Sequence, residues 1–342
     1  MTRTLSEREL NRALLARQML LERAKTPLPR ALERMAGLQA QYAPSMYIAL
    51  WSRLDGFERA QLTRALERRS VIQGSMMRAT IHLVSKRDYW PFVVGIRQAQ
   101  RTWWLRTHGR DLDAKTIAAN DRKVRRAFDG GTLTRAELEA VLGTRLGLAG
   151  VFLDLVRVPP SGTWERRRAD LYALAEDWVG PESATEADGI GLLVRRYLQG
   201  FGPARPAEIA DWASLDVKTT RQALERLELR RFRDEDGKEL VDLPRLPLPD
   251  ADTPAPARFL PVWDATLLVH ARRTQILPER ERPRIFNVRT PQSANTFLVD
   301  GQVAGTWRYE KDRVRIEPFG RLAKGVRAEL DEEAERLGGF HA

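Results

Sequence analysis

A chain of 342 residues, 43% hydrophobic and 30% charged, can form two or three globular domains. The absence of cysteine excludes disulfides, thiolate catalysis and zinc or iron–sulfur centres with Cys ligands. The formal net charge of +11 favours a polyanionic partner such as nucleic acid. The excess of Arg over Lys, 49 to 8, could in part reflect a GC-rich genome.

Residues 1–110 are predicted to form several helices, then a strand and one long helix. Ser6 and Glu9 have the spacing of a capping box, and apolar residues follow at helical intervals. Further helices are expected over 29–38, 47–53 and 58–69, and a strand or strand pair over 76–84.

Residues 111–186 show the order helix, helix, hairpin. The first helix is expected over 115–128, before the Gly130-Gly131 break, and the second begins at a capping box formed by Thr134 and Glu137. A β-hairpin is expected within 155–166.

Residues 187–243 show the same order more clearly. Helices are expected over 190–198 and 206–212, and a third helix is capped by Asp216. A hairpin with its turn at 234–237 follows at once, which is the layout of a winged helix. Lys218 and Arg221 would lie on the recognition helix and contact DNA. Three such units in succession predict tandem winged helices.

The rest of the chain is predicted to be a linker and a β-domain. Residues 244–258 are rich in proline and are expected to form a linker. Residues 259–342 are expected to form a small antiparallel barrel or sandwich and a terminal helix over 323–337. Its strands are expected at 265–269, 284–288, 296–299, 302–308 and 313–318. The predicted fold class is therefore mainly α with β.

Several kinds of site lack their signatures. The sequence has no phosphate-binding P-loop, no dinucleotide-binding glycine motif, no HExxH and no GxSxG. Its four histidines are scattered and no carboxylate cluster is apparent, so we expect no metal, no cofactor and no two-metal nuclease. No apolar run reaches the roughly 18 residues of a membrane span and no secretory signal is visible. We expect a cytoplasmic, nucleoid-associated monomer.

The segment Gly37-Leu-Gln-Ala-Gln41 places two glutamines at positions i and i+2. In an extended loop both amides would point to the same side, each offering an acceptor and two donors. The alternative is a polar loop between helices whose glutamines satisfy nearby backbone groups.

The chain resembles the AlkZ-type winged-helix DNA glycosylases. The resemblance covers nearly the whole sequence in order, at residues 10–23, 37–41, 50–54, 77–84, 297–301, 303–307 and 317–319. It implies three tandem winged helices and a C-terminal β-barrel in a C-shaped clamp around double-stranded DNA. It also implies a metal-independent, monofunctional enzyme for N-alkylated purines, including bulky natural-product adducts and interstrand crosslinks in branches linked to antibiotic self-resistance.

The resemblance assigns catalysis to a Gln-aliphatic-Gln motif, which Gln39, Ala40 and Gln41 match; a sister branch has Asp at the last position. Two neutral amides agree with the chemistry of such a substrate, because a purine alkylated at N7 or N3 is cationic and leaves with little or no protonation. What remains is an oxocarbenium-like sugar and an attacking water, which an amide can orient.

Other residues are candidates for DNA or lesion contacts, and for several of them a packing or structural role is the alternative. His82 could instead be a hydrogen-bonded core residue, and Trp51 could pack between neighbouring leucines. Of Trp103 and Trp104, only one ring is expected to face inward. The candidates are Tyr42, Trp51, Arg78, Thr80, His82, Lys218, Arg221 and Asp264.

A second function remains open from the sequence, namely a non-catalytic winged-helix regulator or lesion sensor. The unit at 187–243 alone would support it. The glutamine pair favours the enzyme, and the size of the physiological adduct stays undetermined.

Overall fold

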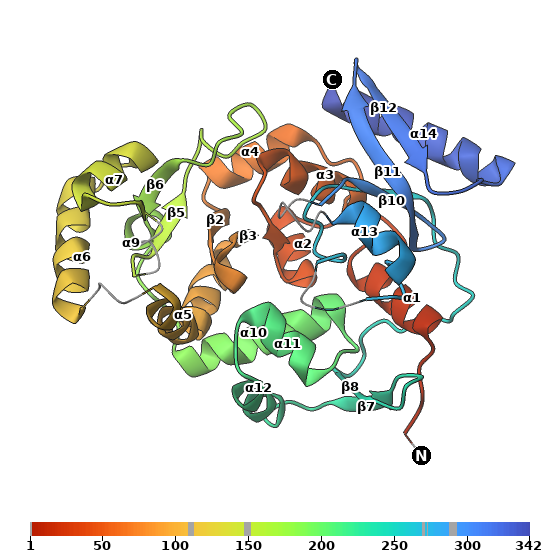
Figure 1. Ribbon diagram of the computed structural model, residues 1–342, viewed down its shortest axis with the longest axis horizontal. Helices are drawn as coiled ribbons and strands as arrows, with labels where there is room; N and C mark the ends of the chain where they lie inside the picture. The colour runs from red at the N-terminus through yellow and green to blue at the C-terminus, as the bar shows by residue number, and fades with distance from the viewer. Residues whose placement is uncertain (1, 109–112, 147–151, 269–270, 272, 287–292) are drawn as a thin grey trace.

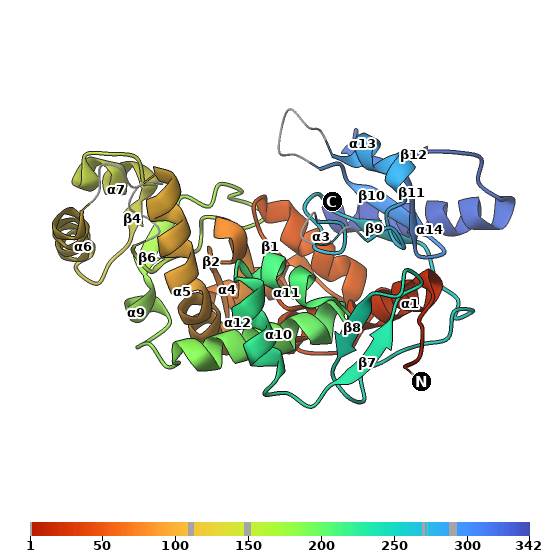
Figure 2. The same cartoon turned by 60° about the horizontal axis from the view of Figure 1, so that its bottom comes forward.

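The computed structural model describes residues 2–108, 113–146, 152–268, 271, 273–286 and 293–342. Figures 1 and 2 both place helices α6 (Ala114–Phe128) and α7 (Arg135–Leu142) at one end of the long axis. The C-terminal helix α14 (Lys324–His341) lies at the other end. Within the described ranges, no helix is long and apolar enough to cross a bilayer.

A six-stranded sheet runs through the first two predicted units. Its strand order is β1-β3-β2-β5-β6-β4. Strand β2 pairs with β5 at Gly74↔Val156, so the sheet continues across the predicted boundary at residue 110. The strands are β1 (Leu38–Gln39), β2 (Val71–Ser75), β3 (Ile81–Ser85), β4 (Leu133–Thr134), β5 (Leu155–Arg157) and β6 (Leu171–Leu174).

The N-terminal helices agree with the sequence prediction to within a few residues. The Ser6–Glu9 capping box is confirmed at the start of the first helix. These helices are α1 (Glu7–Arg17), α2 (Leu28–Met35), α3 (Ala43–Arg53), α4 (Arg59–Glu67) and α5 (Lys86–His108).

The strand predicted over 76–84 is wrong in its first half, and β2 was not predicted. Residues Met77–Ala79 form a tight turn and not a strand, because Arg78 and Ala79 have φ of 55° and 54°, in the left-handed region. Only Ile81 onward is strand.

Helix α5 crosses α10 (Glu186–Phe201) at very short distance through two glycines. A Cβ on Gly95 would lie 2.6 Å from the backbone carbon of Gly189, so neither position accepts a larger residue without moving a helix. Farther along α5, Trp104 is buried and Trp103 is 45% exposed, which confirms that one ring faces inward.

The third unit has the predicted order. Helices α10, α11 (Pro206–Ala213) and α12 (Val217–Leu224) are followed by the hairpin of β7 (Arg230–Arg233) and β8 (Glu239–Asp242). Asp216 caps α12 by accepting a hydrogen bond from the Thr219 N–H at 2.7 Å. In the second unit the Thr134 capping box is confirmed. The loop of its hairpin is longer than predicted, because residues 159–166 form turns and bends before β6. Helix α9 (Ala175–Trp178) follows β6.

The C-terminal sheet has the order β12-β11-β10-β9 and is open, so the described residues do not form the predicted closed barrel. Helix α14 packs against β12. The predicted strands at 296–299, 302–308 and 313–318 and the terminal helix are confirmed. The elements are β9 (Arg258–Leu260), β10 (Thr296–Val299), β11 (Gln302–Glu310) and β12 (Arg313–Pro318).

Two predicted strands of this region are wrong. Residues 265–268 form turns, because Asp264 Oδ1 accepts hydrogen bonds from the Thr266 N–H at 3.1 Å and hydroxyl at 2.8 Å. Arg284 lies in the short helix α13 (Arg282–Ile285), which has Pro283 in its first turn and follows the 3-10 turn η3 (Glu279–Glu281). Residues 269, 287 and 288 are outside the described residues.

The proline-rich segment 244–257 has no helix or strand, as predicted, but it is held in place. Arg12 Nε donates to the Thr253 carbonyl at 2.6 Å, and Arg17 Nη2 donates to the Pro247 carbonyl at 3.0 Å. Arg17 also forms a fully buried ion pair with Asp242 at 2.7 Å. Helix α1 thereby joins the third unit to the segment that leads to the C-terminal sheet.

Candidate active site

The glutamine motif lies where a sharp turn brings β1 against β3. Helix α2 ends at Met35, Ala36 is left-handed and Gly37 has φ of +78°. A Cβ on Gly37 would lie 2.9 Å from Val84 Cγ1, so the close approach and the backbone angle both require glycine. The next two residues pair with β3, with Gln39 opposite His82.

Each amide of the motif is oriented by a group that can only donate. Arg78 Nη2 lies 3.3 Å from Gln39 Oε1, and the Ile81 N–H lies 3.0 Å from Gln41 Oε1. The atom facing each donor must therefore be the amide oxygen. Each oxygen keeps a second acceptor position, and each NH2 remains a donor. Gln39 is 8% exposed, whereas Gln41 is exposed.

Arg78 connects this motif to the third unit. Its Nη1 donates to the Trp212 carbonyl at 3.0 Å, and its backbone N–H donates to Ser214 Oγ at 2.8 Å. Burial lowers the pKa of Arg78 to about 10, with the nearby Arg273 acting in the same direction. The guanidinium stays charged at neutral pH and fixes the Gln39 oxygen.

His82 is a buried, neutral neighbour of Gln39. Its Nδ1 lies 3.1 Å from the Thr80 carbonyl, so Nδ1 carries the proton. The Thr80 hydroxyl lies 3.4 Å from the same nitrogen and donates to the Met77 carbonyl at 3.0 Å. Burial and then the charge of Arg78 lower the pKa of His82 to about 3. Thr80 and His82 thus support the turn around Arg78.

A groove leads from Arg78 to the start of α12. This cavity of about 690 Å³ is lined by Arg78, by residues of α5 that include Arg106, and by Asp216 and Thr219. The exposed side chains of Lys218 and Arg221 lie on the same helix α12. The groove therefore runs from the predicted recognition helix to Arg78, the residue that holds Gln39.

A family model for the AlkZ-like DNA glycosylases matches residues 32–340. The chain belongs to the AlkZ-like DNA glycosylase family. It is therefore an enzyme of DNA repair that binds DNA and hydrolyses N-glycosyl bonds.

A solved structure supports the fold of this AlkZ-like glycosylase. The DNA glycosylase AlkZ of Streptomyces sahachiroi superposes with a TM-score of 0.81 over 98% of this chain and 97% of that chain. The two sequences are 19% identical, so this likeness shows the fold alone. No curated protein matches the chain.

The remaining predicted residues of the AlkZ-like glycosylase lie at different places. Tyr42 is 41% exposed and follows Gln41 directly; its hydroxyl accepts a hydrogen bond from Arg167 at 3.2 Å. Trp51 is half-buried between the Arg23 guanidinium, 4.7 Å from its ring, and the ring of Phe340, 6.0 Å away. These contacts are those of a packing residue.

Asp264 is fully buried in an ion pair with Arg53 at 2.9 Å, which links α3 to the C-terminal region. Its carboxylate accepts hydrogen bonds from Arg53 and Thr266, and it forms none with either glutamine. The structure therefore brings together Gln39, Gln41, Arg78, Thr80 and His82, and leaves Trp51 and Asp264 in packing positions.

Three residues that support the motif in the AlkZ-like glycosylase were not predicted from the sequence. The buried Gln73 donates from its amide to the Ala40 carbonyl at 3.4 Å, between the two glutamines. Trp212 and Ser214 act through Arg78. A glutamine inside the apolar run Val71-Ile-Gln73 was a usable signal, whereas the other two contacts are non-local and left none.

Proposed function

We propose that this glycosylase releases N-alkylated, cationic purines from double-stranded DNA, above all N7-alkylguanine, and leaves an abasic site without cutting the strand. Bulky natural-product adducts and interstrand crosslinks belong to the same chemical class. The observation that carries the proposal is the neutral pair Gln39 and Gln41, each amide held by a fixed donor.

A neutral pair suits a substrate that already bears positive charge. The cationic base is a good leaving group, so the enzyme needs no strong general acid. The free acceptor positions of the two amide oxygens can hold the attacking water and face the positive charge that develops on the sugar. Because His82 is neutral, it adds no positive charge beside Gln39 that would repel the positive charge developing on the sugar.

The enzyme is further proposed to work without a metal. Among the described residues, no three His, Asp or Glu side chains gather as a metal would require. A monofunctional reaction is proposed because β-elimination needs a desolvated lysine, and the chain has only eight lysines, none in such a setting in the sequence.

The test is to incubate the protein with duplex DNA containing N7-methylguanine, in excess EDTA, and then to heat in alkali. We expect strand cleavage at the modified position after alkali and none before it. Tight binding without base release would instead favour a lesion sensor. Release that needs a divalent ion would contradict the metal-free mechanism.

A further inference from the structure

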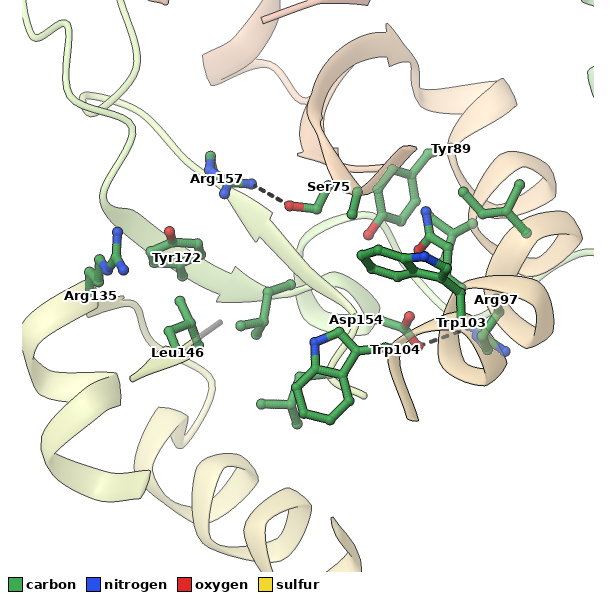
Figure 3. Close-up of a pocket in the computed structure, with 16 residues that line it drawn as sticks. Ser75, Tyr89, Arg97, Trp103, Trp104, Arg135, Leu146, Asp154, Arg157 and Tyr172 are labelled. Atoms are coloured by element: carbon green, nitrogen blue, oxygen red, sulfur yellow. Dashed lines mark hydrogen bonds and ion pairs between the residues drawn. The ribbon is translucent and has the colours of Figure 1, made fainter. Parts of the chain in front are cut away.

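A second pocket, of about 360 Å³, lies between helix α5 and strands β5 and β6 (Figure 3). Its volume is within the range of small-molecule sites. Figure 3 shows Tyr172 and Arg157 on one side and Trp103 and Trp104 on the other. Its lining includes four aromatic side chains, those of Tyr89, Trp103, Trp104 and Tyr172. Trp103 is the exposed one of these rings, and an exposed planar ring can bind a nucleobase by stacking.

The pocket adjoins the glutamine motif. Ser75 and Ala79 form part of its wall. Ser75 pairs across the sheet with Ile81, whose N–H holds Gln41, and neighbouring strands are about 4.8 Å apart. Ala79 directly follows Arg78, which holds Gln39. The wall of the pocket therefore reaches the strand and the turn that hold the two glutamines.

The charges of the wall point to an anion. Three guanidinium groups line the pocket, those of Arg97, Arg135 and Arg157, against the single carboxylate of Asp154. Arg97 pairs with Asp154 at 3.0 Å, and Arg135 pairs with Glu139, outside the pocket, at 3.0 Å.

Arg157 is the guanidinium left for a ligand. It donates to Ser75 Oγ at 3.1 Å and lies over the Tyr172 ring at 5.2 Å. Within the described part of the chain, no carboxylate forms an ion pair with it. Burial lowers the pKa of Arg157. Its partners are thus a hydroxyl and an aromatic ring, and an anionic ligand such as a phosphate would supply the counter-charge that it lacks.

We propose that this pocket binds one undamaged nucleotide of the DNA substrate, unstacked beside the lesion, with its base on the Trp103 ring and its phosphate at Arg157. The inference rests on the proposed function. The alkylated base itself fits less well, because it is cationic and the wall carries three guanidinium groups to one carboxylate. Stacking in the pocket offsets the cost of leaving the duplex.

The test compares Trp103→Ala with Leu105→Ala, a matched control on the same helix. Both side chains are exposed, 45% and 40%, and Leu105 does not line the pocket. The probe is a duplex containing a tetrahydrofuran abasic analogue, which has no damaged base, and binding is followed by fluorescence anisotropy. We expect Trp103→Ala to weaken binding about 10-fold, Trp103→Phe to restore most of it, and Leu105→Ala to change nothing.

Arg157→Met tests the phosphate contact on the same duplex. It should lower the slope of log affinity against log salt by about 0.9, the value for one phosphate contact. Thermal unfolding checks each variant, and the equally uncharged Arg157→Gln replaces Arg157→Met if the latter lowers the midpoint.

Wild-type affinity of Trp103→Ala for the abasic duplex would overturn the inference. Slower release of N7-methylguanine with unchanged affinity for the abasic duplex would also overturn it, because the pocket would then bind the alkylated base. If the wild-type protein binds DNA but releases no base, the proposed function fails, and the anisotropy comparison still decides the pocket.

Discussion

Gln39 and Gln41 are two residues apart, but their environments differ. Gln39 is buried and held by a side chain, whereas Gln41 is exposed and held by a backbone N–H. A carboxylate at position 41 could accept the same hydrogen bond from Ile81. Aspartate, which the resemblance places at this position in a sister branch, is one methylene shorter than glutamine, and the exposed position has room for it to adjust.

We predict that Gln41→Asp keeps base release from N7-methylguanine DNA, whereas Gln41→Ala loses on the order of 10²-fold in rate. The loss should appear in the rate and not in DNA affinity, because the amide acts mainly in the transition state. Single-turnover release and anisotropy on the same duplex measure the two quantities. An aspartate variant as slow as the alanine variant would contradict this role.

His82 makes stability depend on pH in a predictable direction. Its pKa is lowered to about 3 in the folded protein and is about 6.5 in the unfolded chain. Between these values the unfolded chain binds a proton that the folded protein does not. The free energy of unfolding therefore falls as pH decreases through this window, by up to about 1.4 kcal/mol per unit.

His82→Gln should remove this part of the slope. The measurement is urea unfolding of both proteins at several pH values between 6 and 4. His341, whose pKa is also lowered, to about 4, is present in both proteins and cancels. Equal slopes would mean that His82 charges in the folded state.

At the scale of elements, local signals predicted the helices and hairpins that they control. The Thr134 capping box, the Asp216 cap and the hairpin of the strands predicted at 296–299 and 302–308 all lie where the sequence placed them. The predictions failed where side-chain contacts or backbone angles overrode the pattern. Asp264 turns the chain after β9, and Arg78 interrupts the strand predicted over 76–84.

In the candidate active site, too, local features were predictable from the sequence and non-local contacts were not. The glutamine pair was visible in the sequence, but the resemblance, and not the spacing alone, indicated that the pair is catalytic. Its supports at Trp212 and Ser214 lie more than 130 positions away from Arg78 along the chain, so only the fold could show them. The joining of two units by one sheet was likewise invisible, because β2 was not predicted.

The turn before β1 gives a test at the element scale. Gly37→Ala should destabilise the fold by about 1–3 kcal/mol, because the position has φ of +78° and the new Cβ would meet Val84 and the Leu83 carbonyl. It should also slow base release by shifting Gln39. Gly325→Ala is the control, since nothing lies within 4 Å of its Cβ and it is in helix α14. The free energy of unfolding of both variants is measured in urea. Equal losses for the two would contradict backbone strain at position 37.

At the scale of the whole molecule, the net charge of +11 and the groove between Arg78 and α12 predict many phosphate contacts. Affinity for undamaged duplex DNA should fall by orders of magnitude between about 50 and 200 mM salt, because phosphate contacts release counterions. Anisotropy titrations on unrelated sequences should give similar slopes and similar affinities. A flat response to salt would contradict an extended DNA surface.

The most direct test of the account is single-turnover release of N7-methylguanine, in EDTA and at saturating protein, by the wild type, by Gln39→Ala, by Gln41→Ala and by the double variant. We predict that each single variant loses on the order of 10²-fold in rate with DNA affinity retained. The double variant should lose less than the product of the two, because in the proposed mechanism both amides hold one water. Release at the wild-type rate by all three variants would show that the motif is structural and that the active site lies elsewhere.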